Sequence, residues 1–231
     1  MLVAVGSLSK LFSESAEPYL EYRIVENLFC KSFVADNLSR SDTSADALKE
    51  KTGFGIKTFL EGNGKTMQKV AEFNREHNLF NNLNTDQKIL KIANLRNERL
   101  ETTKRIFALS ELIYHCVTRK AGKIFVYETP VHLIDVGSIK DLKLNGNSIL
   151  FKDNFNEYSF NIAKSTLYKR FITENIILDI PVKIIDDPFI AIEKLFYDTQ
   201  IRDFEIKKIF SPLKEQKHIL LPLYSYDNEK R

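Results

Sequence analysis

The stretch SRSDTSADALKEKTGFGIKTFLEGNGKTMQKVAEFN, residues 39–74, contains the most informative pattern in this chain. Its central part, GFGIKTFL at 53–60, predicts a strand. Alternate side chains of a strand face opposite ways, so Gly55 would share a face with Lys57. A shorter strand is predicted over 44–48, before a charged turn. The stretch therefore predicts two neighbouring strands joined by a hairpin turn.

Helices are predicted on both sides of these strands. Residues 18–35 carry apolar side chains at helical spacing, after a proline that suits a first turn, and a polar loop follows. On the other side, the tight turn EGNG leads into a helix predicted over 65–79. Gln68 and Glu72 are four residues apart, so both would share one face of that helix.

The rest of the chain predicts a helical region followed by a β-rich half. In order, we expect a helical stretch at 84–120, strands at 123–129 and 132–136, hairpins at 139–162, a short helix at 163–174, a strand at 176–186 that Pro181 confines to an edge or a bulge, a helix at 188–198 and a strand at 218–225. The predicted fold class is α/β or α+β, with a mixed sheet flanked by helices.

Composition sets broad limits on what the protein can be. A chain of 231 residues fits one large domain, and 43% hydrophobic with 28% charged residues is ordinary for a globular protein. The net charge of +3 is too weak to indicate nucleic-acid binding. No run approaches transmembrane length and the N-terminus lacks a secretion signal, so we expect a soluble, cytoplasmic protein with no membrane partner.

Cysteine and histidine usage argues against several metal and nucleophile sites. Cys30 and Cys116 lie far apart in apolar contexts typical of helices, which favours buried thiols over a zinc site. The sequence GNGK at 62–65 lacks the full spacing of a phosphate loop and is more typical of a turn. None of the four histidines is spaced to form a metal pair; they are His77, His115, His132 and His218.

The stretch at 39–74 contains the residue types that phosphodiester hydrolysis needs. A metal ion polarises the phosphate and activates water, and Mg²⁺ is usually held by one or two carboxylates. Asp46 on the first strand and Lys57 on the second could reach one face of a sheet. Glu72 on the following helix, with Gln68 nearby, could supply a second acid. Each also has an ordinary interpretation, as a turn, a solvated strand or an exposed helix face.

The predicted order of elements resembles the core of the PD-(D/E)XK nucleases. That order is a helix, a strand with Asp46, a turn, a strand ending in Lys57, and a second helix. The sequence over about 18–175 is similar to type II restriction endonucleases of that superfamily. The segments that carry this similarity are NLSRSDTSADA, GFGIKTF, QKVAEFN and NGNSILFKDNFNEYSFNIAKSTLYKRF. The resemblance implies one nuclease domain over 1–231. Its catalytic core would cover about 18–130, and a β-rich part that could read DNA would cover about 131–231.

This resemblance implies a Mg²⁺-dependent enzyme that cuts both strands of a specific DNA site. Asp46 and Glu72 would hold the metal and Lys57 would position the water. The sequence departs from the family at Gly55, where an acid usually precedes the lysine by two residues, and at Ala45, where proline is usual. Because of Gly55, a DNA-binding protein without catalytic activity is one alternative interpretation. A repair nuclease with the same core is another.

Further residues and partners follow from the same resemblance. Glu26 on the first helix is similar to an acidic residue that some members aim at the metal, although a surface role is the ordinary interpretation. Palindromic targets favour a homodimer, and a partner DNA methyltransferase is implied. Basic, amide and hydroxyl side chains could contact DNA, although a solvated helix face is an equal interpretation for those at 164–170. They are Arg40, Asn145, Asn147, Lys152, Lys164, Ser165, Tyr168, Lys169 and Arg170.

Overall fold

The computed structural model describes residues 1–38 and 43–198. The chain divides into two compact units, 1–186 and 187–231, and each is described by itself. The described residues form a mixed α+β fold with two open sheets, as the predicted fold class requires. The single nuclease domain expected over 1–231 stays a prediction.

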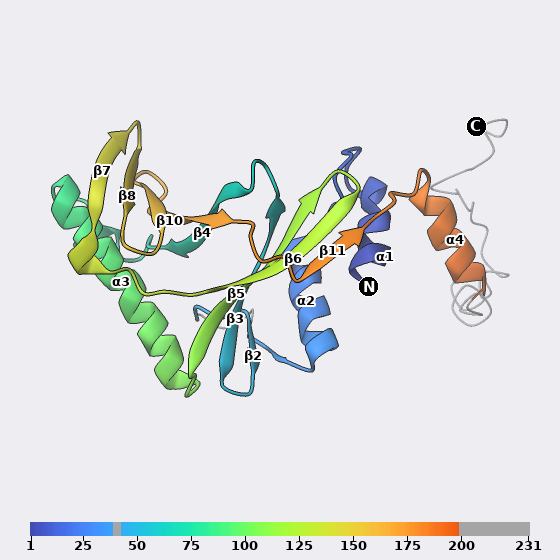
Figure 1. Ribbon diagram of the computed structural model, residues 1–231, viewed down its shortest axis with the longest axis horizontal. Helices are drawn as coiled ribbons and strands as arrows, with labels where there is room; N and C mark the ends of the chain where they lie inside the picture. Colours follow the sequence, from blue (N-terminus) through green and yellow to red (C-terminus); the bar gives the residue numbers. More distant parts are fainter. Residues whose placement is uncertain (39–42, 199–231) are drawn as a thin grey trace, which may run out of the picture. The chain divides into compact units, whose positions relative to one another are not determined.

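The first sheet has six strands and contains the hairpin predicted from the opening stretch (Figure 1). Only β3 and β5 run parallel; every other neighbouring pair is antiparallel. Parallel neighbours cannot be joined by a tight turn, so the chain must leave the sheet between them. The strand order is β1 (Asp36–Asn37), β2 (Ala47–Lys49), β3 (Thr52–Leu60), β5 (Glu111–Lys120), β6 (Lys123–Pro130) and β11 (Leu178–Pro181).

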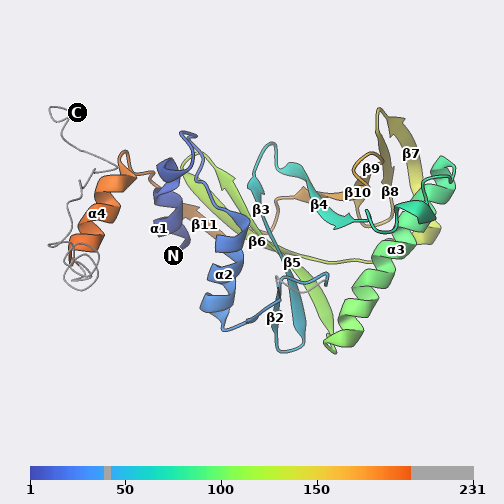
Figure 2. The same ribbon diagram turned by 180° about the vertical axis from the view of Figure 1, so that it is seen from behind.

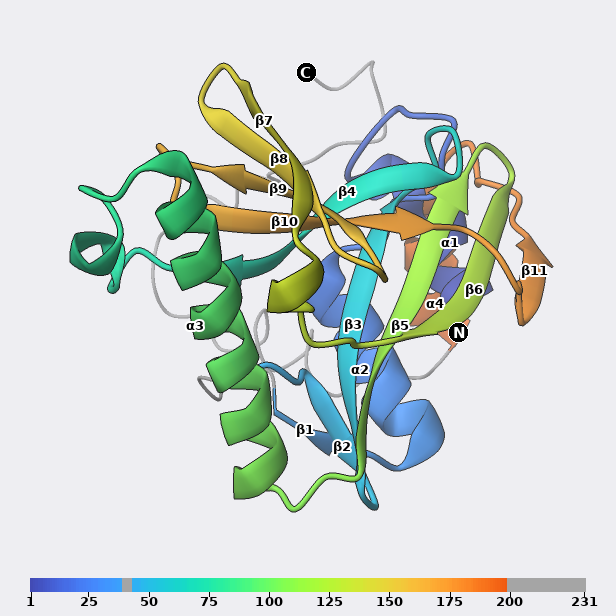
Figure 3. The same ribbon diagram turned by 60° about the vertical axis from the view of Figure 1, so that its left-hand side comes forward.

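The second sheet is antiparallel and takes one strand from that crossover. Its order is β4 (Lys65–Glu72), β10 (Thr166–Ile172), β9 (Glu157–Asn161), β8 (Ser148–Lys152) and β7 (Lys140–Asn145). The long helix α3 (Thr85–Ile106) completes the crossover and runs beside this sheet (Figure 3). Ile89, Ile92 and Ala93 of the helix are fully buried against aromatic side chains of β8 and β9.

Helix α2 (Tyr22–Phe33) packs on the first sheet, against β2 and β3 (Figure 2). It begins where the Glu21 carboxylate accepts hydrogen bonds from two main-chain N–H groups, which caps the first turn. Its apolar face, with Val25 and Phe29, is buried against Ile56 of β3 and Val117 of β5. The predicted helix at 18–35 is therefore confirmed with a later start.

Smaller elements complete the described chain. Helix α1 (Leu2–Ser7) packs beside the first sheet, where Gly6 comes close to Ile124. Short 3-10 turns are η1 (Ser9–Leu11), η2 (His77–Leu79) and η3 (Val136–Ser138). In the second unit, α4 (Pro188–Asp198) has the predicted bounds. None of the helices in the described part of the chain has the length and apolar character needed to cross a bilayer.

Two predicted helices are wrong because their residues pair across the second sheet. Residues 65–79 contain β4, and residues 163–174 contain a turn followed by β10. These two strands pair with each other, from Lys65 with Ile172 to Glu72 with Thr166. Partners about a hundred residues apart leave little local trace, so spacing within either segment could not reveal the pairing.

Other predictions of secondary structure are corrected in part. The helical stretch at 84–120 ends at Ile106, and Glu111–Lys120 is the central strand β5. Cys116 is therefore buried in a strand and not in a helix. Residues 132–136 lead into a 3-10 turn and do not form a strand. Pro181 lies in the edge strand β11, as predicted, and the strand expected at 218–225 lies outside the described residues.

Truncating the buried face of α3 should destabilise the protein far more than truncating its exposed face. Ile92 is 0% exposed and Leu90 is 41% exposed on the same helix. We expect Ile92→Ala to lower the free energy of unfolding by about 2–5 kcal/mol, because it leaves a cavity in the core. Leu90→Ala should lower it by less than about 1 kcal/mol. Urea denaturation of both variants measures this, and equal losses would contradict the packing described.

Candidate functional site

Asp46 immediately precedes β2 and joins it to β3 through both its main chain and its side chain. The backbone N–H of Asp46 donates to the carbonyl of Phe54 at 2.7 Å. The N–H of Ile56 donates to Asp46 Oδ2, also at 2.7 Å. Among the described residues nothing donates to the other oxygen, Oδ1. The fold therefore holds the carboxylate against β3 with one oxygen left for a ligand.

Glu26 supplies a second carboxylate from α2. It is 5% exposed, and Arg23 donates a hydrogen bond to its Oε2 at 3.0 Å. Burial raises the pKa of Glu26, and the negative charge of Asp46 raises it further, while Arg23 and Lys57 lower it in part. The two carboxylates are thus close enough to repel each other. A bound cation between them would relieve that repulsion.

Lys57 brings a positive charge to the same neighbourhood from β3. It is half-buried and lies opposite Cys116 of β5. Its Nζ is 5.9 Å from the ring centroid of Tyr114. Its charge also acts on Glu26, whose pKa it lowers. Asp46, just before β2, and Lys57, in β3, therefore both lie near enough to Glu26 of α2 for their charges to act on it.

Packing explains why no acid stands at Gly55. A side-chain Cβ at this position would lie 2.9 Å from Cδ1 of Tyr114, the residue opposite it in β5. Tyr114 is 4% exposed, and its hydroxyl accepts a hydrogen bond at 2.9 Å from Nη2 of the buried Arg96. The tyrosine ring is therefore fixed over the glycine, in the space that a carboxylate would need.

Glu72 and Gln68 lie elsewhere than predicted. Both are in β4 of the second sheet and not on a helix, and Gln68 lies opposite Lys169 of β10. Glu72 is exposed, forms a salt bridge of 2.9 Å with Lys69, and has its pKa lowered by that lysine. The charges that act on Glu26 are instead those of Asp46, Arg23 and Lys57.

Glu72 nevertheless lines a polar cavity of about 600 Å³ between the end of β4 and α3. Thr43 and Ser44, which lead into Asp46, line the same cavity. Ser44 is held there because its N–H donates to the Thr103 hydroxyl of α3 at 3.1 Å. Glu72 is thus connected to the Asp46 loop across a cavity, without a described contact between the two acids.

Sequence reasoning missed one carboxylate of this neighbourhood. Asp36, in β1, acts together with Glu26 and Asp46 to raise the pKa of Cys30, after the larger effect of burial. Asp36 was expected in a polar loop, and nothing local in the sequence marks the short strand that holds it. In the described part of the chain, no three acidic, histidine or cysteine side chains are arranged to hold a metal.

The residues predicted to contact DNA fall into two groups, buried ones and ones that reach the surface. Ser165 and Lys169 are 2% and 4% exposed, so neither offers a surface that duplex DNA could contact in this structure. Ser165 instead hydrogen-bonds His77 at 3.0 Å. Arg40 lies outside the described residues.

The remaining predicted contacts reach the surface of the second sheet. Arg170 forms a salt bridge of 2.6 Å with Glu157, and Lys152 forms one with Asp141. Tyr168 is half-buried. Three others are exposed in or beside turns: Asn145, Asn147 and Lys164. These side chains remain candidates for contacting a phosphate or a base edge.

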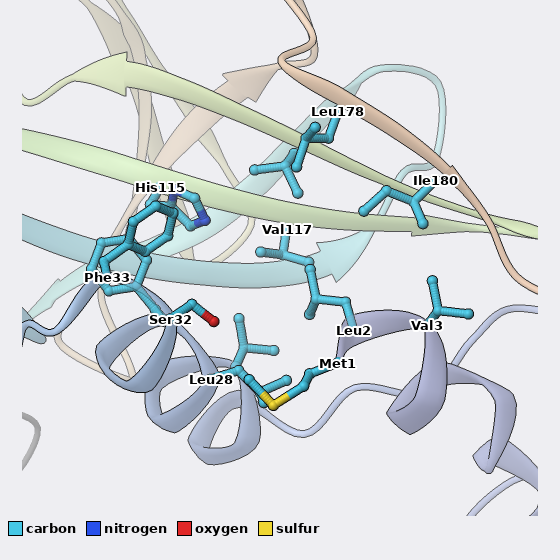
Figure 4. Close-up of a pocket in the computed structure, with 13 residues that line it drawn as sticks. Met1, Leu2, Val3, Leu28, Ser32, Phe33, His115, Val117, Leu178 and Ile180 are labelled. Carbon is cyan, nitrogen blue, oxygen red and sulfur yellow. The ribbon is translucent and has the colours of Figure 1, made fainter.

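A separate cavity of about 290 Å³ opens between α1, α2 and the first sheet (Figure 4). Apolar side chains line almost all of it, including Leu28, Val117 and Ile180. Its polar side chains are Ser32 and His115, and Nδ1 of His115 is 2.8 Å from Glu128. No carboxylate lines this cavity, so it lacks the groups for metal-dependent hydrolysis.

Neither a protein-family model, nor a curated protein, nor a solved structure matches this chain. The resemblance to PD-(D/E)XK nucleases therefore stays a prediction that rests on the sequence.

Restoring the acid that the family pattern expects should destabilise the fold. We expect Gly55→Asp to lower the free energy of unfolding by about 1–3 kcal/mol, because the new side chain is forced against the fixed ring of Tyr114. Gly62→Asp is the matched control, since the nearest atom to a Cβ there is 4.0 Å away. Thermal unfolding compares the two, and a stable Gly55→Asp protein would show that Tyr114 can move aside.

Proposed function

We propose that this protein is a Mg²⁺-dependent, site-specific double-stranded DNA endonuclease of the type II restriction kind. The observation that carries the proposal is that the charges of Asp46 and Lys57, from the β2–β3 hairpin, both act on the buried Glu26 of α2. Two repelling carboxylates beside a lysine are the charge pattern that metal-assisted phosphodiester hydrolysis uses.

The arrangement of elements supports a PD-(D/E)XK core. Helix α2 is followed by the antiparallel strands β1, β2 and β3, and then by a crossover that contains α3 and leads to the parallel strand β5. Asp46 immediately precedes β2, the first strand of the hairpin, and Lys57 lies within β3, the second. These are the positions in which the resemblance places the metal ligand and the catalytic lysine.

In the proposed site, Asp46 and Glu26 hold the metal through carboxylate oxygens. We propose Glu26 in place of Glu72 as the second ligand, because Glu26 and Asp46 interact and Glu72 instead pairs with Lys69. Two carboxylates suffice, since Mg²⁺ usually completes its shell with water and substrate phosphate. Bound Mg²⁺ would polarise the scissile phosphate and lower the pKa of the attacking water.

Lys57 is proposed to orient that water and to stabilise the charge that develops on the phosphate. Lys57 is half-buried in β3, and its Nζ lies 5.9 Å from the ring centroid of Tyr114. Side chains that reach the surface of the second sheet and its turns are proposed to contact DNA, among them the half-buried Arg170 and Lys152 and the exposed Asn147. A homodimer would match a two-fold symmetric target, with a methyltransferase protecting the host site.

One observation favours a second candidate, a DNA-binding protein that does not cleave. The family acid is replaced by Gly55, and Tyr114 fills its place. A site with fewer carboxylates holds a metal more weakly, so the fold could have kept DNA binding after losing hydrolysis. A cleavage assay separates the two candidates.

Lys57→Ala should abolish cutting without abolishing DNA binding. We expect cleavage of plasmid DNA in Mg²⁺ to fall by roughly a hundredfold or more, because a group that stabilises the transition state is lost. Lys65→Ala, an exposed lysine of β4, is the matched control and should cut normally. Discrete fragments from the parent protein support a restriction enzyme and a smear supports a repair nuclease. A Lys57→Ala protein that cuts like the parent excludes the assigned role.

Mg²⁺ should raise the melting temperature through Glu26 and Asp46. Because ligand binding to the folded state alone stabilises it, the midpoint should rise with Mg²⁺ concentration. The rise should disappear in Asp46→Asn and in Glu26→Gln, and persist in Glu72→Gln. Loss of the effect in Glu72→Gln alone would instead identify Glu72 as the ligand. Differential scanning fluorimetry with Mg²⁺ titration measures each case.

A further inference from the structure

Lys169 of β10 is a buried lysine that the proposed nuclease mechanism does not use. It is 4% exposed, and its Nζ donates one hydrogen bond, to the carbonyl of Arg170 at 3.3 Å. Within the described residues no carboxylate forms a salt bridge with it. Two aromatic rings also lie close to it, with Nζ at 4.3 Å from the ring centroid of Phe171 and 5.8 Å from that of Tyr114.

This environment makes the neutral amine of Lys169 more populated than that of an ordinary lysine. Burial lowers the pKa of Lys169 to about 8. Several elements face the group: Cys116 of β5 acts against the shift, Arg96 of α3 lowers the pKa further, and Asp153 before β9 and Glu174 after β10 also act against the shift. A neutral lysine has a free lone pair and is the form that attacks carbonyl carbon.

Lys169 also lines a cavity that is open to a ligand. The cavity has a volume of about 420 Å³ and lies between the end of β6, the β8–β9 turn and β10. This volume is within the range of small-molecule sites. Phe155, which is 58% exposed, lies on its wall with its ring centroid 4.7 Å from that of His132 and the two rings tilted by 43°, so that aromatic faces border the cavity.

Two of the three acids on this wall, Asp153 and Glu157, are already engaged, and Glu174 is the third. Asp153 accepts hydrogen bonds from the main chain of Asp135, Phe155 and Asn156. Glu157 is paired with Arg170. These two carboxylates therefore do not form an ion pair with the amine of Lys169. The cavity combines a nucleophilic nitrogen with aromatic side chains.

We propose that Lys169 forms an imine with a small aromatic aldehyde bound in this cavity. The lone pair of Nζ attacks the aldehyde carbon and gives a carbinolamine. The carbonyl oxygen then leaves as water with both amine hydrogens, and a C=N bond replaces the C=O bond. No oxidant or reductant is needed, and addition of water reverses the step. The proposal does not depend on nuclease activity.

The test uses pyridoxal 5′-phosphate as the aromatic aldehyde, followed by borohydride reduction and peptide mapping of the full chain. Lys164, exposed on the turn before β10, is the internal control. At pH 8 about half of an amine of pKa 8 is neutral, against roughly one in three hundred for an ordinary lysine. We therefore expect Lys169 to be labelled about tenfold or more faster than Lys164. Its labelling rate should rise with pH and level off above about 8.

Two variants distinguish a specific binding site at Lys169 from the general reactivity of lysine side chains. Phe155→Ala removes an exposed ring, and so should leave the fold intact while slowing the labelling of Lys169 severalfold and leaving Lys164 unchanged. Lys169→Arg should abolish the fast labelling and leave the slow labelling of Lys164 unchanged. Labelling of Lys169 no faster than Lys164 in the unmodified protein, or no effect of Phe155→Ala, overturns the proposal. Neither result bears on DNA cleavage.

Discussion

The parallel pairing of β3 with β5 is the constraint on which the rest of the structure depends. Nine residues of each strand are in register, from Thr52 with Glu111 to Leu60 with Arg119. Because parallel strands need a long connection, the chain between them is free to build β4 and α3. β4 then joins the second sheet, and α3 covers that sheet with its apolar face. The pairing of β3 with β5 thus connects the hairpin of the first sheet, through the crossover, with the second sheet.

The same pairing sets the chemistry of the candidate site. The register places Tyr114 opposite Gly55, and Arg96 of the crossover helix fixes the hydroxyl of that tyrosine. An acid at position 55 has no room, so the site depends on Asp46 and on Glu26 from α2. The register also places Lys57 opposite Cys116, with its ammonium beside the same tyrosine ring that Lys169 approaches from the second sheet.

Local patterns predicted some elements well and failed where a distant partner decided the outcome. The strand at 53–60 and the helices predicted at 18–35 and 188–198 were confirmed, the first helix with the shorter bounds 22–33, because alternation, apolar spacing and proline act within a few residues. The helices at 65–79 and 163–174 were wrong, since β4 and β10 exist through their mutual pairing. Lys169 occupies an inward position of β10, which no local rule assigns to a lysine.

The sequence by itself determined the hairpin that carries Asp46 and Lys57, because a turn between two short strands is a local property. It also identified Glu26 as an acid on the neighbouring helix. Only the tertiary structure decided that Glu26 interacts with Asp46, that Glu72 belongs to another sheet, and that Lys169 is buried beside a cavity. The physical reason is that charge repulsion and burial depend on distances between elements, and packing of the whole chain fixes those distances.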